Sequence, residues 1–337
     1  MLINYSIRRG RRHISDNVEC QDFAHSKFAD NKSPVNILAV SDGCSSAKFA
    51  LEAAKVNCYA SEEFFSDLKN WNNISNPEKI VDSFLKFVAR KLDDTGADYD
   101  QLAATIASAA IMNNGDYIVL SLGDCTVIAY DNDFSPRIFC KPFNIGDSFS
   151  TIFTNNYKNG MKYMMLKTGN IFRENINGFA LFTDGCESLT DELLKGAESM
   201  RDAAFDLAVG SNPDVLNNMT EYIADNLTTD DAAIGIILSD SAVDESKRVI
   251  NDLNERMHNM DQNMNSTASA DRPFSDQPPM YDYILRALAQ SPKTAEELVN
   301  EGICHNGCVL STMKPLVEMK LVHFAGGKFS LAQGFLS

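Results

Sequence analysis

Apolar and polar residues follow two different periods along the first 240 residues, one typical of strands and one typical of helices. Short runs rich in Val, Ile, Leu and Phe, separated by turn pairs such as Asn114-Gly115, predict strands. The predicted strands are Ile37–Ser41, Thr105–Met112, Tyr117–Ser121, Thr126–Tyr130, Lys162–Leu166, Phe179–Thr183 and Ala232–Leu238. The second to fourth of these follow one another closely and predict a meander.

Apolar residues at i, i+3 and i+4 predict two long helices, Ser46–Leu68 and Pro77–Asp94. Shorter helices are predicted at Asp191–Leu194, Arg201–Ala208 and Asp214–Asn226. Strands in meanders with helices grouped between them favour an α+β fold in which helices cover the sheets. The regular strand–helix alternation of a doubly wound parallel fold is absent.

The apolar pattern fades after residue 240, which predicts a boundary. Val249, Leu253 and Met257 recur at helical spacing and predict a short helix in the first half of the following segment. The second half is rich in Ser, Asn, Asp and Pro, which is typical of a flexible linker. We therefore expect a large domain at 1–240, a linker at 241–279 and a small domain at 280–337.

The small domain is predicted to contain three helices and a hairpin. The helices are expected at Tyr281–Gln290, from Thr294 to about Gly302, and at His305–Met319, and the hairpin turns at Gly326-Gly327. This order resembles a winged helix-turn-helix domain. Residues 280–337 carry five basic and five acidic side chains, a poor electrostatic footprint for DNA. Protein binding or dimerisation is therefore favoured over DNA binding.

Charge and composition narrow the class of protein. The net charge is −16, with 46 acidic against 30 basic residues, which argues against a general nucleic-acid binder. The first residues lack the apolar stretch of a secretory signal, and no window approaches the length of a membrane span. The eight cysteines are scattered, and the Cys304/Cys308 pair has no second pair to complete a zinc site. We expect a cytoplasmic protein with reduced thiols and no membrane partner.

Four short acidic segments stand at the ends of strand-like runs or beside them. They contain Gln21-Asp22, Asp42-Gly43, Asp184-Gly185 and Asp230-Asp231. Carboxylates that converge from distant strand ends are how proteins hold hard divalent cations. An Asp-Gly pair can also be a simple turn, and an Asp-Asp pair can be a solvated loop. The repetition of the pattern favours a metal site, because adjacent carboxylates repel unless a cation compensates them.

A fifth pair completes an ordered set of motifs. Gly123-Asp124, between two predicted strands, would alone be assigned to a hairpin turn. In order, Gln21-Asp22, Ser41-Asp42-Gly43, Gly123-Asp124-Cys125, Thr183-Asp184-Gly185 and Asp230-Asp231 resemble the motifs of the metal-dependent serine/threonine phosphatases of the protein phosphatase 2C family. The resemblance covers about residues 1–240. It implies a four-layer α–β–β–α sandwich of two antiparallel sheets, with a binuclear metal site at one end.

The resemblance also implies a set of ligands for two Mn²⁺ or Mg²⁺ ions. Asp42, Asp184 and Asp230 match direct ligands, and the backbone carbonyl of Gly43 is implied as a further one. Asp22 is implied to bind directly or through a water molecule. These expectations rest on motif matches and not on spacing alone.

Two further aspartates are implied in lesser roles. Asp124 matches the position of a third, weaker metal, and Asp231 would support the ligands from outside the coordination sphere. The implied reaction is hydrolysis of phosphoserine and phosphothreonine by direct attack of a hydroxide shared between the two metals. The implied partners are a phosphoprotein substrate and a cognate serine/threonine kinase or its targets.

One departure concerns the substrate phosphate. The better-known branch of the family has a phosphate-binding arginine five residues before the early aspartate, whereas this chain has Asn17 there. A divergent bacterial branch instead has a histidine ahead of Cys-Gln-Asp, as in this chain. His13, Arg11 or Arg12 could take the phosphate role, while His13 could equally be a surface residue at a strand end.

The missing arginine leaves a second hypothesis open. A catalytically weak or inactive phosphatase fold could serve as a regulator that binds phosphoproteins, or DNA through the winged helix. The complete set of aspartates favours an active enzyme.

Overall fold

The computed structural model describes residues 1–132, 134–143, 151–190 and 196–251, six single positions between 284 and 298, and two short strands near the C-terminus. The chain divides into two compact units, Met1–Ser246 and Lys247–Ser337. None of the helices in the described part of the chain combines the length and the apolar character that crossing a bilayer requires.

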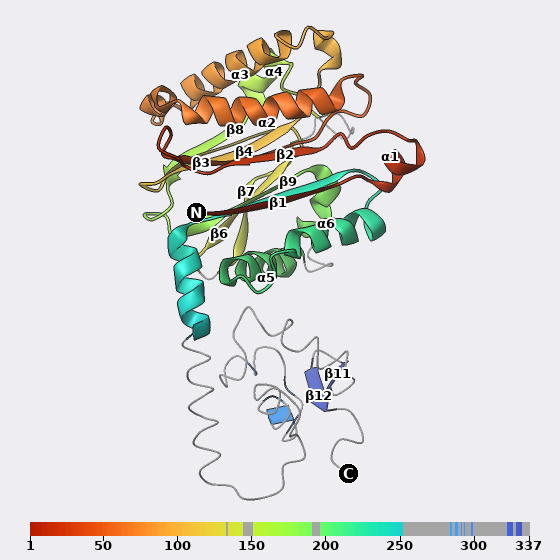
Figure 1. Ribbon diagram of the computed structural model, residues 1–337, viewed down its shortest axis with the longest axis vertical. Helices are drawn as coiled ribbons and strands as arrows, with labels where there is room; N and C mark the ends of the chain where they lie inside the picture. The colour runs from red at the N-terminus through yellow and green to blue at the C-terminus, as the bar shows by residue number, and fades with distance from the viewer. Residues whose placement is uncertain are drawn as a thin grey trace, which may run out of the picture. The chain divides into compact units, whose positions relative to one another are not determined.

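Two five-stranded antiparallel sheets form the centre of the first unit (Figure 1). The strand order of one sheet is β1 (Leu2–Arg8), β10 (Ala232–Leu238), β9 (Ile176–Phe182), β6 (Thr126–Asp131) and β7 (Pro136–Cys140). The order of the other sheet is β2 (Phe23–Lys27), β3 (Val35–Ser41), β4 (Ile106–Met112), β5 (Asp116–Leu122) and β8 (Met165–Asn170). Each sheet therefore combines strands from both halves of the unit.

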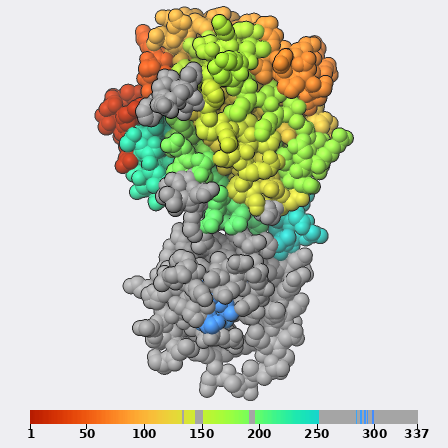
Figure 2. All heavy atoms as spheres, turned by 180° about the vertical axis from the view of Figure 1, so that it is seen from behind, coloured from red at the N-terminus to blue at the C-terminus, as the bar shows by residue number. Residues whose placement is uncertain are grey.

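Helices cover the outer face of each sheet. The second sheet is covered by α2 (Ala50–Ser66), α3 (Pro77–Asp93) and α4 (Tyr157–Tyr163), and the first by α5 (Gly196–Val209) and α6 (Val215–Asn226). The short helix α1 (Arg11–Ser15) lies at one end of the sandwich (Figure 1). Seen from behind, the surface of this unit is formed largely by the middle of the chain, coloured yellow to green in Figure 2. The expected α+β sandwich with helices outside is confirmed.

The strand β3 shows why the sequence folds into layers. All seven of its residues are buried, as expected for a continuous apolar run in a central strand. Alternate side chains face opposite ways, so Ile37 and Ala39 pack with α2 and α3, in the core that contains Phe84. Leu38 and Val40 pack in the core between the two sheets. One strand thus contributes to both hydrophobic cores.

Several boundaries differ from the sequence-based expectations. The run Lys162–Leu166 was expected to be one strand, but it spans the end of α4 and the start of β8. The first long helix begins at Ala50 and not at Ser46. The pattern did not predict β1, β2 or β7, whose faces are only partly buried. The helix predicted at Asp191–Leu194 lies outside the described residues.

The second unit is described only in part. Strands β11 (Val322–Ala325) and β12 (Lys328–Leu331) pair antiparallel, which confirms the predicted hairpin. Residues 240–251, which begin in the first unit, are helical and include the start of the helix expected in the linker. Most of the three helices expected after residue 280 lies outside the described residues, so the winged-helix domain stays a prediction.

Candidate metal centre

The antiparallel registers bring the acidic motifs to one end of the sandwich. In the second sheet Ser41, the last residue of β3, pairs with Phe23, the first residue of β2. In the first sheet Phe182, the last residue of β9, pairs with both Ile234 of β10 and Thr126 of β6. At this end of each sheet, the last residue of one strand therefore lies beside the first residues of its neighbours, as antiparallel pairing requires. The aspartates just beyond these residues meet there.

Three of the predicted ligands form a compact group. Each of Asp42, Asp124 and Asp184 offers a carboxylate oxygen within 4.8 Å of the others. One oxygen of Asp124 is buried and has no hydrogen-bond partner among the described residues. Converging carboxylate oxygens are the ligands that Mg²⁺ and Mn²⁺ prefer, and a buried oxygen without a hydrogen-bond donor suits a cation as its partner. The residues present therefore fit a divalent cation.

The pKa values of these carboxyls are raised above their usual range. Burial, followed by the charges of Asp124 and Asp230, raises the pKa of Asp184 to about 7. Burial is also the main reason why the pKa of Asp42 lies well above its usual range, with Asp22 as the next cause. The pKa of Asp124 is raised by burial as well. The acids of this cluster thus raise one another's pKa, an effect that a bound cation would offset.

Asp22 is almost fully buried, with 2% of its surface exposed. Its Oδ2 accepts a hydrogen bond of 2.6 Å from the hydroxyl of Thr183, the residue between β9 and Asp184. Burial raises the pKa of Asp22 well above the usual range, although the Thr183 hydroxyl opposes that shift. Asp22 therefore joins the start of β2 in one sheet to the end of β9 in the other.

Gly43 has no space for a side chain. A Cβ at this position would lie 2.6 Å from the backbone carbonyl of Ala50 and 2.9 Å from that of Gln21. Its N–H donates to the carbonyl of Gln21 at 3.2 Å. Glycine is required here because the chain passes between α2 and the segment that leads to Asp22.

Asp230 lies outside the three-carboxylate group. Its side chain is 42% exposed and lies 3.9 Å from the guanidinium of Arg12, measured from Oδ1 to the Nη2 nitrogen. Oδ1 also accepts a hydrogen bond from the N–H of Asp231. Asp230 still acts on the group electrostatically, since its charge raises the pKa of both Asp124 and Asp184. Its role as a direct ligand stays a prediction.

His13 is neither on a strand nor at the surface. It lies on α1 with 4% of its surface exposed, so the surface alternative is wrong. Its Nδ1 donates to Oδ2 of Asp231 at 2.7 Å. A contact with substrate phosphate would therefore have to use the other ring nitrogen, Nε2.

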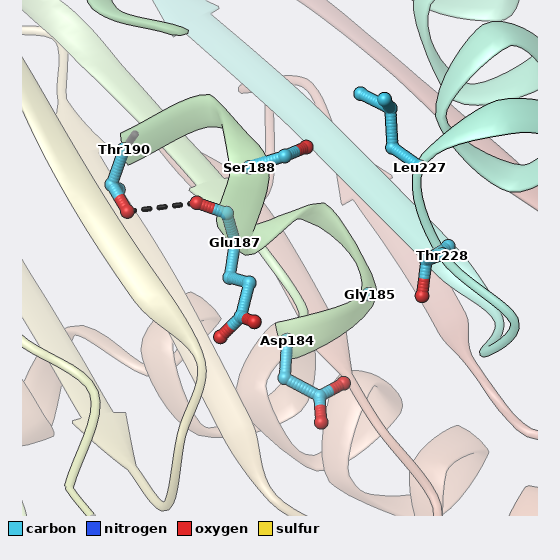
Figure 3. Close-up of a pocket in the computed structure, with 7 residues that line it drawn as sticks. All are labelled: Asp184, Gly185, Glu187, Ser188, Thr190, Leu227 and Thr228. Carbon is cyan, nitrogen blue, oxygen red and sulfur yellow. Dashed lines mark hydrogen bonds between the residues drawn. The ribbon is translucent and has the colours of Figure 1, made fainter. Parts of the chain in front are cut away.

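A cavity of about 430 Å³ opens beside Asp184, between the 3₁₀ helix η3 (Asp184–Thr190) and the loop after α6. The residues that line it, drawn in Figure 3, are Asp184, Gly185, Glu187, Ser188, Thr190, Leu227 and Thr228. Glu187 was not predicted as a site residue, although its charge raises the pKa of Asp124 and Asp184. The one sequence signal for it is its position, about one helical turn after Asp184.

The fold and the site together define a class of protein: a two-sheet sandwich that presents carboxylates for divalent cations at one end. The family model of protein phosphatase 2C matches residues 9–266, so the chain belongs to the protein phosphatase 2C family. No match was found among curated proteins.

Several solved structures share the fold of this chain. A bacterial serine phosphatase has a TM-score of 0.51 at 12% identity, over 70% of this chain and 96% of its own. The serine/threonine phosphatase of Staphylococcus aureus has a TM-score of 0.51 at 11% identity, over 71% and 96%. A sex-determining protein of C. elegans has a TM-score of 0.53 at 13% identity, over 73% and 67%. At such identities these similarities establish the fold alone.

Proposed function

We propose that this protein is a metal-dependent phosphatase that hydrolyses phosphoserine and phosphothreonine in proteins. The observation that carries the proposal is the group formed by Asp42, Asp124 and Asp184, whose oxygens converge within 4.8 Å at the end of a phosphatase 2C sandwich. The raised pKa values of these carboxyls support it, because a bound cation is the counter-charge that such a cluster lacks. Asp42 and Asp184 would be the central ligands.

The remaining predicted ligands would complete the cation sites. Asp22, the carbonyl of Gly43 and Asp230 flank the group, and Asp124 would serve a third cation. Two Mn²⁺ or Mg²⁺ ions would supply Lewis-acid activation of water and neutralise the charge of the phosphate oxygens. The carboxylates of the chain would fix the positions of the ions and leave the cavity beside Asp184 for the substrate.

Arg12 is the residue best placed to orient the substrate phosphate. Arg11 is less suited to this role, because its guanidinium already donates through Nε and Nη2 to the carbonyl of Thr228, at 3.2 and 2.8 Å. The Arg12 side chain is 46% exposed, and one of its nitrogens lies 3.9 Å from Asp230. A planar guanidinium can bind two phosphate oxygens at once, which suits it to this role. Arg12 would thus replace the arginine that this chain lacks at position 17.

The test is Mn²⁺-dependent hydrolysis of para-nitrophenyl phosphate and of a phosphoserine peptide. Asp42→Asn and Asp184→Asn should each lose nearly all activity, because an amide cannot supply the negative charge that holds the cation. Asp82→Asn is a matched control, since Asp82 lies on α3 and pairs with Lys86 outside the cluster. Equal background rates in the wild type and all three variants would end the enzyme proposal and favour a non-catalytic phosphoprotein-binding regulator.

A further inference from the structure

The carboxylate of Asp231 accepts three hydrogen bonds from residues that lie 210 to 221 positions earlier in the chain. Oδ1 accepts from the backbone N–H of Gly10 at 2.7 Å. Oδ2 accepts from the backbone N–H of Gln21 at 2.6 Å and from Nδ1 of His13 at 2.7 Å. Asp231 is 2% exposed and His13 is 4% exposed. This buried carboxylate therefore fastens both ends and the middle of segment 10–21.

Gln21 connects Asp231 to the cluster of carboxylates. Its N–H donates to Asp231, while its carbonyl accepts the N–H of Gly43 at 3.2 Å. The next residue in the chain is Asp22, whose carboxyl reaches Thr183. A shift of the Gln21 backbone would therefore move Asp22 and Gly43 together, although they belong to different motifs.

Segment 10–21 fits tightly against the chain that precedes β10. A Cβ at Gly10 would lie 2.2 Å from the carbonyl carbon of Asp230. The N–H of Arg12 donates to the carbonyl of Thr229 at 3.0 Å. The imidazole of His13 donates to Asp231 at 2.7 Å, and the thiol of Cys20 also contacts this carboxylate. Loss of the imidazole removes a side-chain donor that the two backbone amides do not replace.

We propose that His13 is a positioning residue for the metal centre and acts through Asp231. Its Nδ1–H fixes the rotamer of that carboxylate, which then holds the backbone of Gln21. Gln21 in turn sets Asp22 and Gly43 relative to the end of β3. The inference rests on the proposed function, because it gives His13 a role at the cations that this function requires. Hydrogen-bonded partners of ligands act in this way in other metal sites.

The experiment measures the Mn²⁺ dissociation constant by calorimetry, and kcat and KM for para-nitrophenyl phosphate, in the wild type, His13→Ala and His13→Asn. Asparagine retains an N–H donor close to the position of Nδ1, so it is the rescue variant. His25→Ala is the matched control, because His25 pairs with Glu62 away from the carboxylate cluster.

His13→Ala should raise the Mn²⁺ dissociation constant about 10- to 100-fold, the usual effect of removing a partner of a metal ligand, and should lower kcat. KM should stay within about twofold of the wild type, because the imidazole does not touch the substrate. His13→Asn should return the dissociation constant to within about threefold of the wild type, and His25→Ala should leave it unchanged.

Three results would overturn the positioning role. One is a wild-type dissociation constant in His13→Ala with a raised KM, which would make His13 a phosphate contact. Another is a folded His13→Asn that binds Mn²⁺ as weakly as His13→Ala. The third is failure of both variants to fold, which would assign the pair to folding of the unit. Absence of Mn²⁺ binding in the wild type would instead refute the proposed function, so the two failures are distinguishable.

Discussion

The free energy of unfolding of the metal-free protein should fall as the pH rises from 5.5 to 8. The carboxyl of Asp184 has a pKa of about 7 in the folded chain, against 3.8 for an unperturbed carboxyl, because it is partly buried beside other acids. The folded state therefore holds this proton more tightly than the unfolded state does. The stabilisation is complete below the unfolded pKa and is lost as the pH rises through the folded pKa.

The size of the effect follows from the two pKa values. Each pKa unit corresponds to about 1.4 kcal/mol, so ionising Asp184 in the folded metal-free protein costs about 4 kcal/mol in total. About 2 kcal/mol of this loss falls between pH 5.5 and pH 8, since the folded pKa lies inside that interval. Asp22, Asp42 and Asp124 have pKa values raised in the same direction and add to the loss.

The assay is urea unfolding of chelator-treated protein at pH 5.5 and pH 8.0, followed by tryptophan fluorescence. The chain has one tryptophan, Trp71, which is 6% exposed and donates to the carbonyl of Phe65. It lies in the first unit, so its signal reports the unfolding of the sandwich that carries the site. Saturating Mn²⁺ at pH 8.0 should restore the lost stability, because the cation replaces the protons.

Asp184→Asn separates this cause from a general effect of pH. The variant has no carboxyl to ionise at this position, so its metal-free form should lose about 2 kcal/mol less between the two pH values than the wild type. Asp82→Asn, a half-buried change on α3 outside the cluster, should behave like the wild type. Equal stability of metal-free wild type at both pH values, or higher stability at pH 8.0, would refute the reasoning.

Three further outcomes test other parts of the structure. Arg12→Ala should raise KM for a phosphoserine peptide about 10-fold or more in steady-state kinetics. Its Mn²⁺ dissociation constant, measured by calorimetry, should be unchanged. A weaker affinity for Mn²⁺ would instead show that Arg12 supports the metal site. Thr183→Val removes the hydroxyl that donates to Asp22 and should weaken Mn²⁺ binding about 10-fold by calorimetry. Phe84→Ala should lower the free energy of unfolding by about 3–5 kcal/mol in the Trp71 assay, because Phe84 lies on α3 and is fully buried against α2. A loss below about 1 kcal/mol would contradict that packing.

The sequence predicted the central strands well and the edge strands poorly. Strand β3 is buried on both faces, and its continuous apolar run identified it directly. Strand β1 alternates irregularly between half-buried and exposed positions, so its polarity pattern resembles that of a loop. At residues 162–166 an apolar run crosses from α4 into β8 without a turn residue, which is why one strand was predicted there.

The candidate site was predictable where strand ends carried the signal. Asp42 and Asp184 directly follow apolar strand runs, and both lie in the observed group. Asp124, which is expected to hold a third metal, belongs to this group, whereas Asp230, which is expected to be a direct ligand, lies outside it. The motifs indicate which acids converge. The distances between their carboxylates depend on the geometry of the turns, which the spacing of the motifs in the sequence does not encode.

The motif match implied that Asp231 supports the metal ligands, but the sequence does not show which groups it holds. Two of its three partners are backbone amides, which every residue except proline carries, so no residue type marks them. Among the groups that the hydrogen bonds of Asp231 join, His13 is a side chain of distinctive chemistry, and a histidine near two arginines suggested a phosphate contact. The structure changes that interpretation because the imidazole is buried against a carboxylate. The backbone groups that a residue such as Asp231 holds can be identified only from the folded structure, because no residue type marks them in the sequence.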